Sequence, residues 1–178
     1  AVRRIVGLNL PHGVRRLLPD ADNPTVNIIV DAYKSAYRAA RAEGTLAEPL
    51  FDGIPDLLDS LRADGWLLGV ATGKSSRGLV HCLAAHSLTD HFITLQTADL
   101  HPSKPHPAML EAALGEAFAE SGDAVMIGDT AYDMQMACNA GVRAIGVDWG
   151  YHETAELLAA GAEWVATSPQ ALGEYLKQ

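Results

Sequence analysis

From residue 54 to the end of the chain, segments with strand character alternate with segments with helix character, and this order constrains the fold more than any other feature. Short apolar runs are typical of strands, and longer helix-forming segments separate them. The predicted strands are 66–71, 92–96, 124–127, 143–147 and 164–166. The predicted helices are 54–63, 77–85, 108–118, 131–139, 153–160 and 169–176. This alternation predicts an α/β fold in which a parallel sheet carries helices on both faces.

The first 45 residues have helix character and contain no convincing strand. Residues 1–6 resemble the end of a helix, and residues 11–18 form a second, short helix. A long third helix begins where Asn23 can act as the cap, with a proline in the first turn, and continues until Gly44 ends it. Because helices of this size bury little apolar surface by themselves, we expect them to lie against another part of the protein.

Residues 49–55 combine prolines, a glycine and an aspartate, a composition typical of a linker. The change from purely helical sequence to alternating sequence occurs at the same place. We therefore predict two parts, a small α-helical part over residues 1–48 and an α/β part over residues 49–178.

The predicted strand 124–127 is apolar throughout and is cut off by Gly128 and Asp129. Such a run predicts a strand buried on both faces that ends in a sharp turn. In open α/β folds ligands bind at the carboxyl edge of the sheet, where a carboxylate suits a hard cation such as Mg²⁺. Asp133 follows one helical turn later. The alternative interpretation is that Asp129 or Thr130 only caps the next helix and that Asp133 is solvated.

The predicted strand 66–71 leads directly into Thr72, Gly73 and Lys74. The hydroxyl of Thr72 and the backbone amides of Gly73 and Lys74 could donate hydrogen bonds to a phosphoryl oxygen at the start of the next helix. The alternative is a capping segment that binds no ligand.

Lys104 begins the sequence Lys-Pro-His-Pro in a loop rich in proline and histidine. A proline disfavours the helical region for the residue before it, so we expect this loop to be extended until a helix starts near residue 108. The alternative is a surface lysine beside a proline-rich turn. Because right-handed crossovers bring the carboxyl ends of parallel strands to one edge, Thr72, Lys104 and Asp129 are expected to converge there. A hydroxyl, a cation and a metal-binding acid together suit a phosphate monoester.

Composition excludes some classes of partner. The chain has 178 residues, 48% of them hydrophobic, which is enough for the core of one domain with or without a small insertion. Its 22 acidic and 13 basic residues give a formal charge of -9, which opposes binding to nucleic acids and to anionic membranes. No apolar run approaches the roughly 20 residues that span a bilayer. We predict neither a nucleic-acid partner nor a membrane partner.

Cys82 and Cys138 each lie in a helix-like segment without a second cysteine nearby, so no redox pair or disulfide framework is indicated. Two reduced thiols favour the cytoplasm as the location. Two pairs of histidines are each five residues apart rather than the four of a helical metal pair, which disfavours zinc.

Several motifs in order resemble one known family. They are VATGKS at 70–75, KPHP at 104–107, IGDTAYDM at 127–134 and the C-terminal segment 147–172. Together they resemble a haloacid dehalogenase-superfamily phosphatase of the phosphoglycolate phosphatase-like branch, and the resemblance covers the whole chain. It implies a Rossmann-like parallel sheet, an α-helical cap formed by residues 1–48, Mg²⁺ as the cofactor and a small phosphorylated metabolite as the substrate.

The resemblance also assigns roles to residues. It implies that Thr72 and Lys104 bind the phosphoryl group. It implies that Asp129 ligates Mg²⁺ and that Asp133 supports the metal site. The cap loop 7–13 lies where related proteins place specificity residues, which makes His12 and Arg15 candidates to contact the leaving group. For Arg15 the alternative is an exposed helix surface that binds nothing.

One departure from the family is large. The nucleophile of the family is an aspartate in a D-x-D-G-T segment at the end of the first core strand, and these 178 residues contain no such segment. By analogy the order of strands would be 92–96, 66–71, a gap, 124–127, 143–147 and 164–166. We expect that a preceding stretch supplies the missing strand and the aspartate, and that the 178 residues alone show negligible turnover.

The predicted function is therefore a Mg²⁺-dependent phosphatase that acts through an aspartyl-phosphate intermediate. One alternative is a catalytically silent phosphate-binding or interaction module. A phospho-accepting receiver domain is a further alternative, but it has no place for the helical front part or for the Lys-Pro loop.

Overall fold

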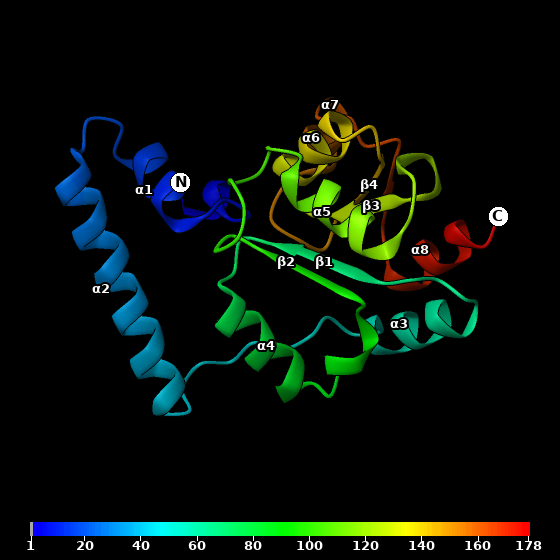
Figure 1. Ribbon diagram of the computed structural model, residues 1–178, viewed down its shortest axis with the longest axis horizontal. Coiled ribbons are helices and arrows are strands. Elements are labelled where there is room, and N and C mark those ends of the chain that lie inside the picture. Colours follow the sequence, from blue (N-terminus) through cyan, green and yellow to red (C-terminus); the bar gives the residue numbers. More distant parts are fainter. Residues whose placement is uncertain (1) are drawn as a thin grey trace.

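The computed structural model describes residues 2–178 and contains an α/β body with a helical arm on one side (Figure 1). The arm begins with a 3₁₀ helix, η1 (Val2–Ile5), followed by α1 (Leu10–Leu17) and the long helix α2 (Asn23–Ala42). Of the helix predicted over residues 1–6, Ala1 lies outside the described residues. The division into a cap and a core at residue 48 stays a prediction.

The cap of α2 differs from the prediction. Asp22, not Asn23, precedes the helix, and its carboxylate accepts the amide hydrogen of Thr25 at 2.9 Å. Both residue types are good caps, so the sequence pattern did not separate two neighbouring candidates. Val26 and Val30 are buried in α2. Tyr33, on the same helix, is 53% exposed.

All strands are parallel, but they form two sheets instead of one. The strands are β1 (Gly69–Thr72), β2 (Thr94–Thr97), β3 (Val125–Gly128), β4 (Arg143–Val147) and β5 (Trp164–Ala166). β1 pairs with β2, and β4 lies between β3 and β5. In register, Thr72 is opposite Thr97, and Gly128 is opposite Gly146. Within residues 2–178, no ladder joins β1 to β3, which is where the gap was expected.

A large cavity separates the two sheets. Its volume is about 2520 Å³, and residues of both β1 and β3 line it. The strand β3 was predicted to be buried on both faces, and this prediction was wrong, because all four of its residues are only half-buried. The reason is that the edge of β3 that faces β1 has no neighbouring strand.

Helices cover both faces of the sheets, as predicted (Figure 1). One face carries α5 (Ala108–Ala117), α6 (Ala131–Asn139) and α7 (Thr154–Ala159). The other face carries α3 (Ile54–Ala63), α4 (Ser76–Ala85) and α8 (Pro169–Leu176). Two further 3₁₀ helices, η2 (Thr89–His91) and η3 (Ser121–Asp123), precede β2 and β3.

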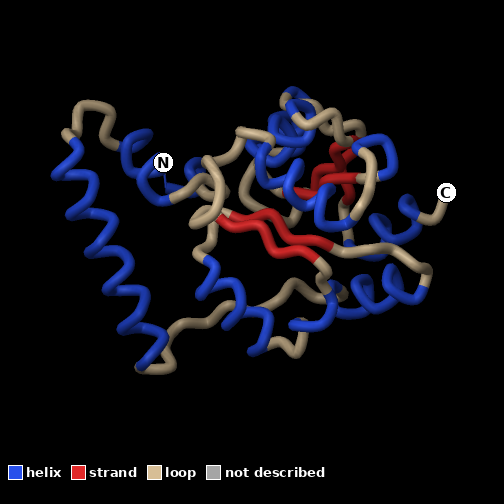
Figure 2. Tube along the Cα trace, viewed as in Figure 1, coloured by secondary structure: helices blue, strands red, loops and turns tan. Residues whose placement is uncertain are grey.

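Each face has its own apolar core. Met134 and Met136 of α6 pack with Met109 of α5 and Leu157 of α7. On the opposite face, Leu172 of α8 packs in a cluster with residues of β4 and β5. The tube in Figure 2 follows the chain through these layers and shows β1 and β2 running side by side. No helix within residues 2–178 is both long and apolar enough to cross a membrane.

Candidate functional site at the carboxyl edge of the strands

Lys104 is buried and connects the two sheets at their carboxyl edge. Its ammonium donates to the carbonyl oxygen of Ala71, in β1, at 2.8 Å. It also forms an ion pair with Asp133 Oδ1, in α6, at 2.6 Å. Both side chains are about 95% buried, at 6% and 4% exposure. A buried charge is tolerated only when it is paired and hydrogen-bonded, so each of these two groups accounts for the burial of the other.

The loop that carries Lys104 is not extended, and that expectation was wrong. Lys104 and Pro105 form a turn with a cis peptide bond, and the amide of His106 donates to the carbonyl oxygen of Ser103 at 3.1 Å. A proline disfavours the helical region for the residue before it, but a turn satisfies that restriction as well as an extended chain does. The helix start near Ala108 is confirmed.

Asp133 is held by the start of its own helix. Its Oδ2 accepts hydrogen bonds from the amide and the hydroxyl of Thr130 at 3.0 and 2.7 Å. Thr130 is the N-cap of α6 and completes a capping box with Asp133. The interpretation in which Thr130 caps the next helix is therefore confirmed. The interpretation of Asp133 as a solvated side chain was wrong, because only 3% of the residue is exposed.

Asp129 lies directly after β3 and faces the loop after β4. Its Oδ2 accepts the amide hydrogen of Tyr151 at 3.0 Å, and its carbonyl oxygen accepts that of His152 at 3.1 Å. A Cβ on Gly150 would lie only 2.1 Å from the Cβ of Asp129, so the close approach of these segments requires glycine. Burial raises the pKa of the Asp129 carboxyl, and the negative charge of Asp133 raises it further.

Thr72 ends β1, and its hydroxyl oxygen accepts the amide hydrogen of Lys74 at 3.2 Å. The ammonium of Lys74 pairs with Glu48 at 2.5 Å. Gly73 lies against the first loop of the chain, because a Cβ there would be 2.9 Å from the carbonyl oxygen of Leu8. The loop after β1 therefore contacts the helical arm at Leu8 through Gly73, and it contacts Glu48, in the segment between α2 and α3, through Lys74.

The structure brings the predicted core residues of the site together. All of them line the cavity between the two sheets, at the ends of β1 and β3 and beside the Lys104 loop. These residues are Thr72, Gly73, Lys74, Lys104, Asp129 and Asp133. The expected convergence of three loops that are distant in sequence is therefore present in the geometry, whereas the chemical role of each residue stays a prediction.

His12 and Arg15 lie apart from this set. Both line a second cavity of about 620 Å³ between α1 and the Lys104 loop, together with Lys104 and His106. His12 and Arg15 are exposed, and Arg15 donates to the side-chain oxygen of Asn23 at 2.6 Å. The contact of His12 and Arg15 with the leaving group stays a prediction.

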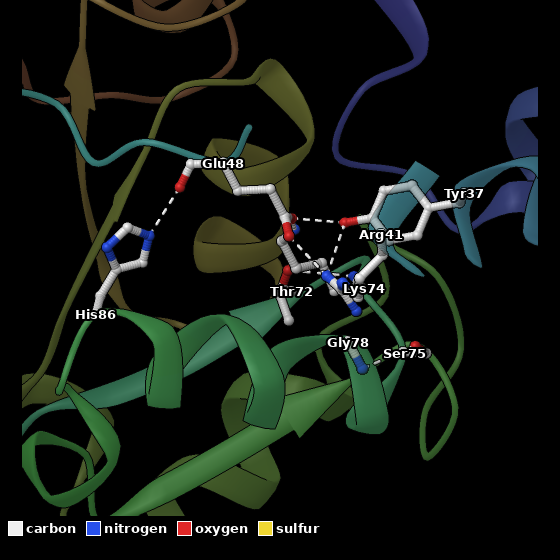
Figure 3. A network of polar contacts seen from close by, with 8 residues as sticks. All are labelled: Tyr37, Arg41, Glu48, Thr72, Lys74, Ser75, Gly78 and His86. Carbon is white, nitrogen blue, oxygen red and sulfur yellow. Dashed lines mark hydrogen bonds and ion pairs between the residues drawn. The ribbon is translucent and has the colours of Figure 1, made fainter. Parts of the chain in front are cut away.

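Sequence reasoning missed Glu48, which lies between α2 and α3 and gathers several polar groups (Figure 3). It also missed Gly150, whose close contact with Asp129 is described above. A single carboxylate in a linker has no spacing that marks it. The glycine could have been noticed, since the Trp-Gly pair follows a predicted strand end at the same edge as Asp129.

The donor set fits Mg²⁺ in part. Magnesium uses one or two protein carboxylates and completes its shell with water and substrate oxygens. Asp129 offers a carboxylate that lines the cavity, and burial together with the charge of Asp133 raises its pKa. Both oxygens of Asp133 are engaged by Lys104 and Thr130. Within residues 2–178, no three histidine, cysteine, aspartate or glutamate side chains gather as a metal site.

Comparison with known proteins establishes the class of the chain. The model of the haloacid dehalogenase-like hydrolase family matches residues 1–147. The chain therefore belongs to the haloacid dehalogenase-like hydrolases, as the motifs indicated.

The chain is also similar to individual phosphatases and to a solved structure. The "Probable phosphatase IndB" of Dickeya dadantii is 34% identical over 166 residues, which cover 90% of this chain and 70% of that protein. A "Phosphoglycolate phosphatase" of Vibrio parahaemolyticus is 26% identical over 120 residues, 67% of this chain. The match spans about half, 53%, of the length of that protein. A crystal structure described as a predicted phosphatase from Clostridium acetobutylicum superposes with a TM-score of 0.88 at 28% identity, covering 98% of this chain and 80% of the other.

Proposed function

We propose that the chain is part of a Mg²⁺-dependent phosphatase that hydrolyses phosphomonoesters of small metabolites, similar to phosphoglycolate phosphatases. The observation that carries this proposal is the buried ammonium of Lys104, held between the end of β1 and Asp133 at the edge where Thr72 and Asp129 also lie. An ammonium fixed in this way is suited to neutralising charge on a phosphoryl group during transfer.

The roles of the remaining residues follow from their donors. Thr72 would donate its hydroxyl to a phosphoryl oxygen, with the amides of Gly73 and Lys74 as further donors. Asp133 would hold Lys104 charged and in place, since an unpaired ammonium in this position would lose its proton or leave the interior. His12 and Arg15 would contact the leaving group from the cap, residues 1–48.

Asp129 would hold the Mg²⁺, with Asp133 supporting the site through its contacts with Lys104 and Thr130. When bound, the cation supplies charge stabilisation to the transferring phosphoryl group. The hydrogen bond from the Tyr151 amide fixes one oxygen of Asp129, so the orientation of the carboxylate is set by this chain's own residues.

The nucleophile is proposed to be an aspartate outside these 178 residues. Its carboxylate would form a bond to phosphorus while the ester P–O bond breaks. The leaving alkoxide would take a proton from the general acid that usually lies two residues after this aspartate in the family, also outside these 178 residues. Water would then cleave the acyl phosphate and release orthophosphate. The predicted cytoplasmic location is part of the same proposal, since phosphorylated metabolites are found there.

Two measurements test the proposal. Isothermal titration of the 178-residue chain with orthophosphate and Mg²⁺ should give weak binding, which Lys104→Met abolishes, while hydrolysis of p-nitrophenyl phosphate stays at background. A longer product of the same gene that includes an upstream D-x-D-T segment should hydrolyse p-nitrophenyl phosphate only with Mg²⁺ present. Phosphate binding without turnover in that longer product would favour a silent binding module instead.

A further inference from the structure

Glu48 is the centre of a polar network between the helical arm and the α/β body (Figure 3). Its Oε1 accepts a hydrogen bond from Tyr37, in α2, at 2.5 Å and pairs with Lys74 at 2.5 Å. Its Oε2 pairs with Arg41, also in α2, at 2.6 Å. The ring of His86, at the end of α4, lies 2.7 Å from the backbone oxygen of Glu48. Glu48 thus contacts three separate segments, namely α2, the loop after β1 and the end of α4.

The network is charged and is only partly shielded from water, since the side chain of Lys74 is 41% exposed. The side chain of Glu48 is 22% exposed and that of Arg41 is 23% exposed. Burial opposes ionisation of Glu48, but hydrogen bonds from Lys74, Tyr37 and Arg41 outweigh it and hold its pKa at about 2. Charge-assisted hydrogen bonds in such surroundings are stronger than neutral ones and fix geometry.

Lys74 extends the network to the end of β1. Its amide donates to the hydroxyl oxygen of Thr72 at 3.2 Å, and its carbonyl oxygen accepts the amide hydrogen of Ala98 at 3.2 Å. The next amide but one, that of Ser76, donates to Asp99 at 2.8 Å. The side chain of Lys74 is therefore held by Glu48, while its backbone amide donates to the hydroxyl oxygen of Thr72.

We propose that Glu48 is a positioning residue for the loop 72–76, which it holds through Lys74 while it anchors the C-terminal end of α2 through Arg41 and Tyr37. In this arrangement the linker carboxylate couples the position of the helical arm to the position of the Thr72 hydroxyl. The importance of this coupling for catalysis rests on the proposed function, whereas the coupling itself is independent of it.

Amide hydrogen exchange of the 178-residue chain, followed by mass spectrometry, tests the proposal directly. Glu48→Gln keeps the shape of the side chain and removes its charge. We expect exchange in peptides covering 72–76 and Ala98 to rise about tenfold, the size expected for losing one charge-assisted hydrogen bond in a locally opening segment. Unchanged exchange in these peptides would overturn the proposal.

Glu163→Gln is the matched control, because Glu163 pairs with Arg143 at a similar distance of 2.6 Å but lies beside β5. It should leave exchange over 72–76 within about twofold of the wild type. Equal effects of the two variants would show general loosening and would contradict a positioning role.

Lys74→Met removes the other end of the contact. Alone it should raise exchange about as much as Glu48→Gln, and the double variant should add little, because both changes break one linkage. Full additivity would overturn the proposal.

Titration with orthophosphate separates the positioning role from the proposed function. If both are correct, Glu48→Gln lowers phosphate affinity several-fold under conditions in which both variants are folded, whereas Glu163→Gln leaves it unchanged. If exchange rises and phosphate affinity is unchanged, Glu48 positions the loop as proposed, and the assignment of Thr72 to the phosphate site is wrong.

Discussion

At the scale of single residues, the pair formed by Lys104 and Asp133 dominates the candidate site. Neither charge has access to bulk water, so each depends on the other and on two neighbouring groups, the Ala71 carbonyl and Thr130. The sequence indicated Lys104 through its proline-flanked loop and Asp133 through its spacing from Asp129. It did not indicate that the two would bond directly, because nothing in a linear pattern states which partner a buried charge finds.

This dependence predicts strong non-additivity. Lys104→Met should destabilise the chain by about 3–5 kcal/mol, because it leaves Asp133 buried and unpaired. Asp133→Asn keeps hydrogen-bonding atoms for Thr130 and should cost about as much. The double variant should cost clearly less than the sum of the two, as measured by guanidinium denaturation. If the double variant loses as much free energy of unfolding as the two single variants together, Lys104 and Asp133 do not depend on each other as described.

At the scale of elements, the order and type of the predicted strands and helices after residue 54 were correct, whereas their limits and burial were not always so. The strand predicted at 66–71 begins three residues later, at Gly69, since the apolar residues before it form no ladder. The half-burial of β3 could not be predicted, because an apolar strand looks the same in sequence whether or not a neighbour occupies each of its edges. Convergence of Thr72 and Asp129 was predictable, because parallel strands place their carboxyl ends together.

The loop after β4 gives a prediction at this scale. Gly150→Ala would place a methyl group against Asp129 and should destabilise the chain by about 1–3 kcal/mol, the usual cost of overpacking. Mg²⁺ affinity should fall with it, since the Asp129 carboxylate must move. Gly122→Ala is the control, because a Cβ there meets no atom within 4 Å. Thermal unfolding and Mg²⁺ titration of both variants check this, and equal behaviour would be contrary to it.

At the scale of the whole molecule, the helical arm and the α/β body are joined by the segment between α2 and α3, which contains Glu48. The sequence predicted a linker over residues 49–55 from its composition, but not the charged network at Glu48, which lies just before it. The reason is that Tyr37, Arg41 and Lys74 are ordinary exposed residue types whose meeting depends on how α2 is placed. Because Glu48 is proposed to hold both the arm and the loop 72–76, the positions of both depend on the ionisation of its carboxyl.

This link predicts a defined pH dependence. Glu48 has its pKa lowered from 4.5 to about 2, so its contribution to folding is complete above pH 4.5 and is lost as the pH falls toward 2. The groups that face it are Tyr37, Arg41, Lys74 and His86. The free energy of unfolding of the wild type should exceed that of Glu48→Gln by about 1.5–3 kcal/mol at pH 7. The difference should shrink progressively below pH 4.5 in urea titrations, and a difference independent of pH would refute the link.

The separation of β1 from β3 affects how the body responds to heat. One apolar cluster spans this separation, because Met109 of α5, which lies on β1 and β2, packs with Met134 and Met136 of α6. The bridge from Ala71 through Lys104 to Asp133 joins the two halves at the carboxyl edge as well. Cooperative melting requires that loosening one half weakens the other, and the shared cluster and the bridge both provide that connection. Calorimetry of the 178-residue chain should therefore give a van't Hoff enthalpy equal to the calorimetric enthalpy, with the two halves melting together.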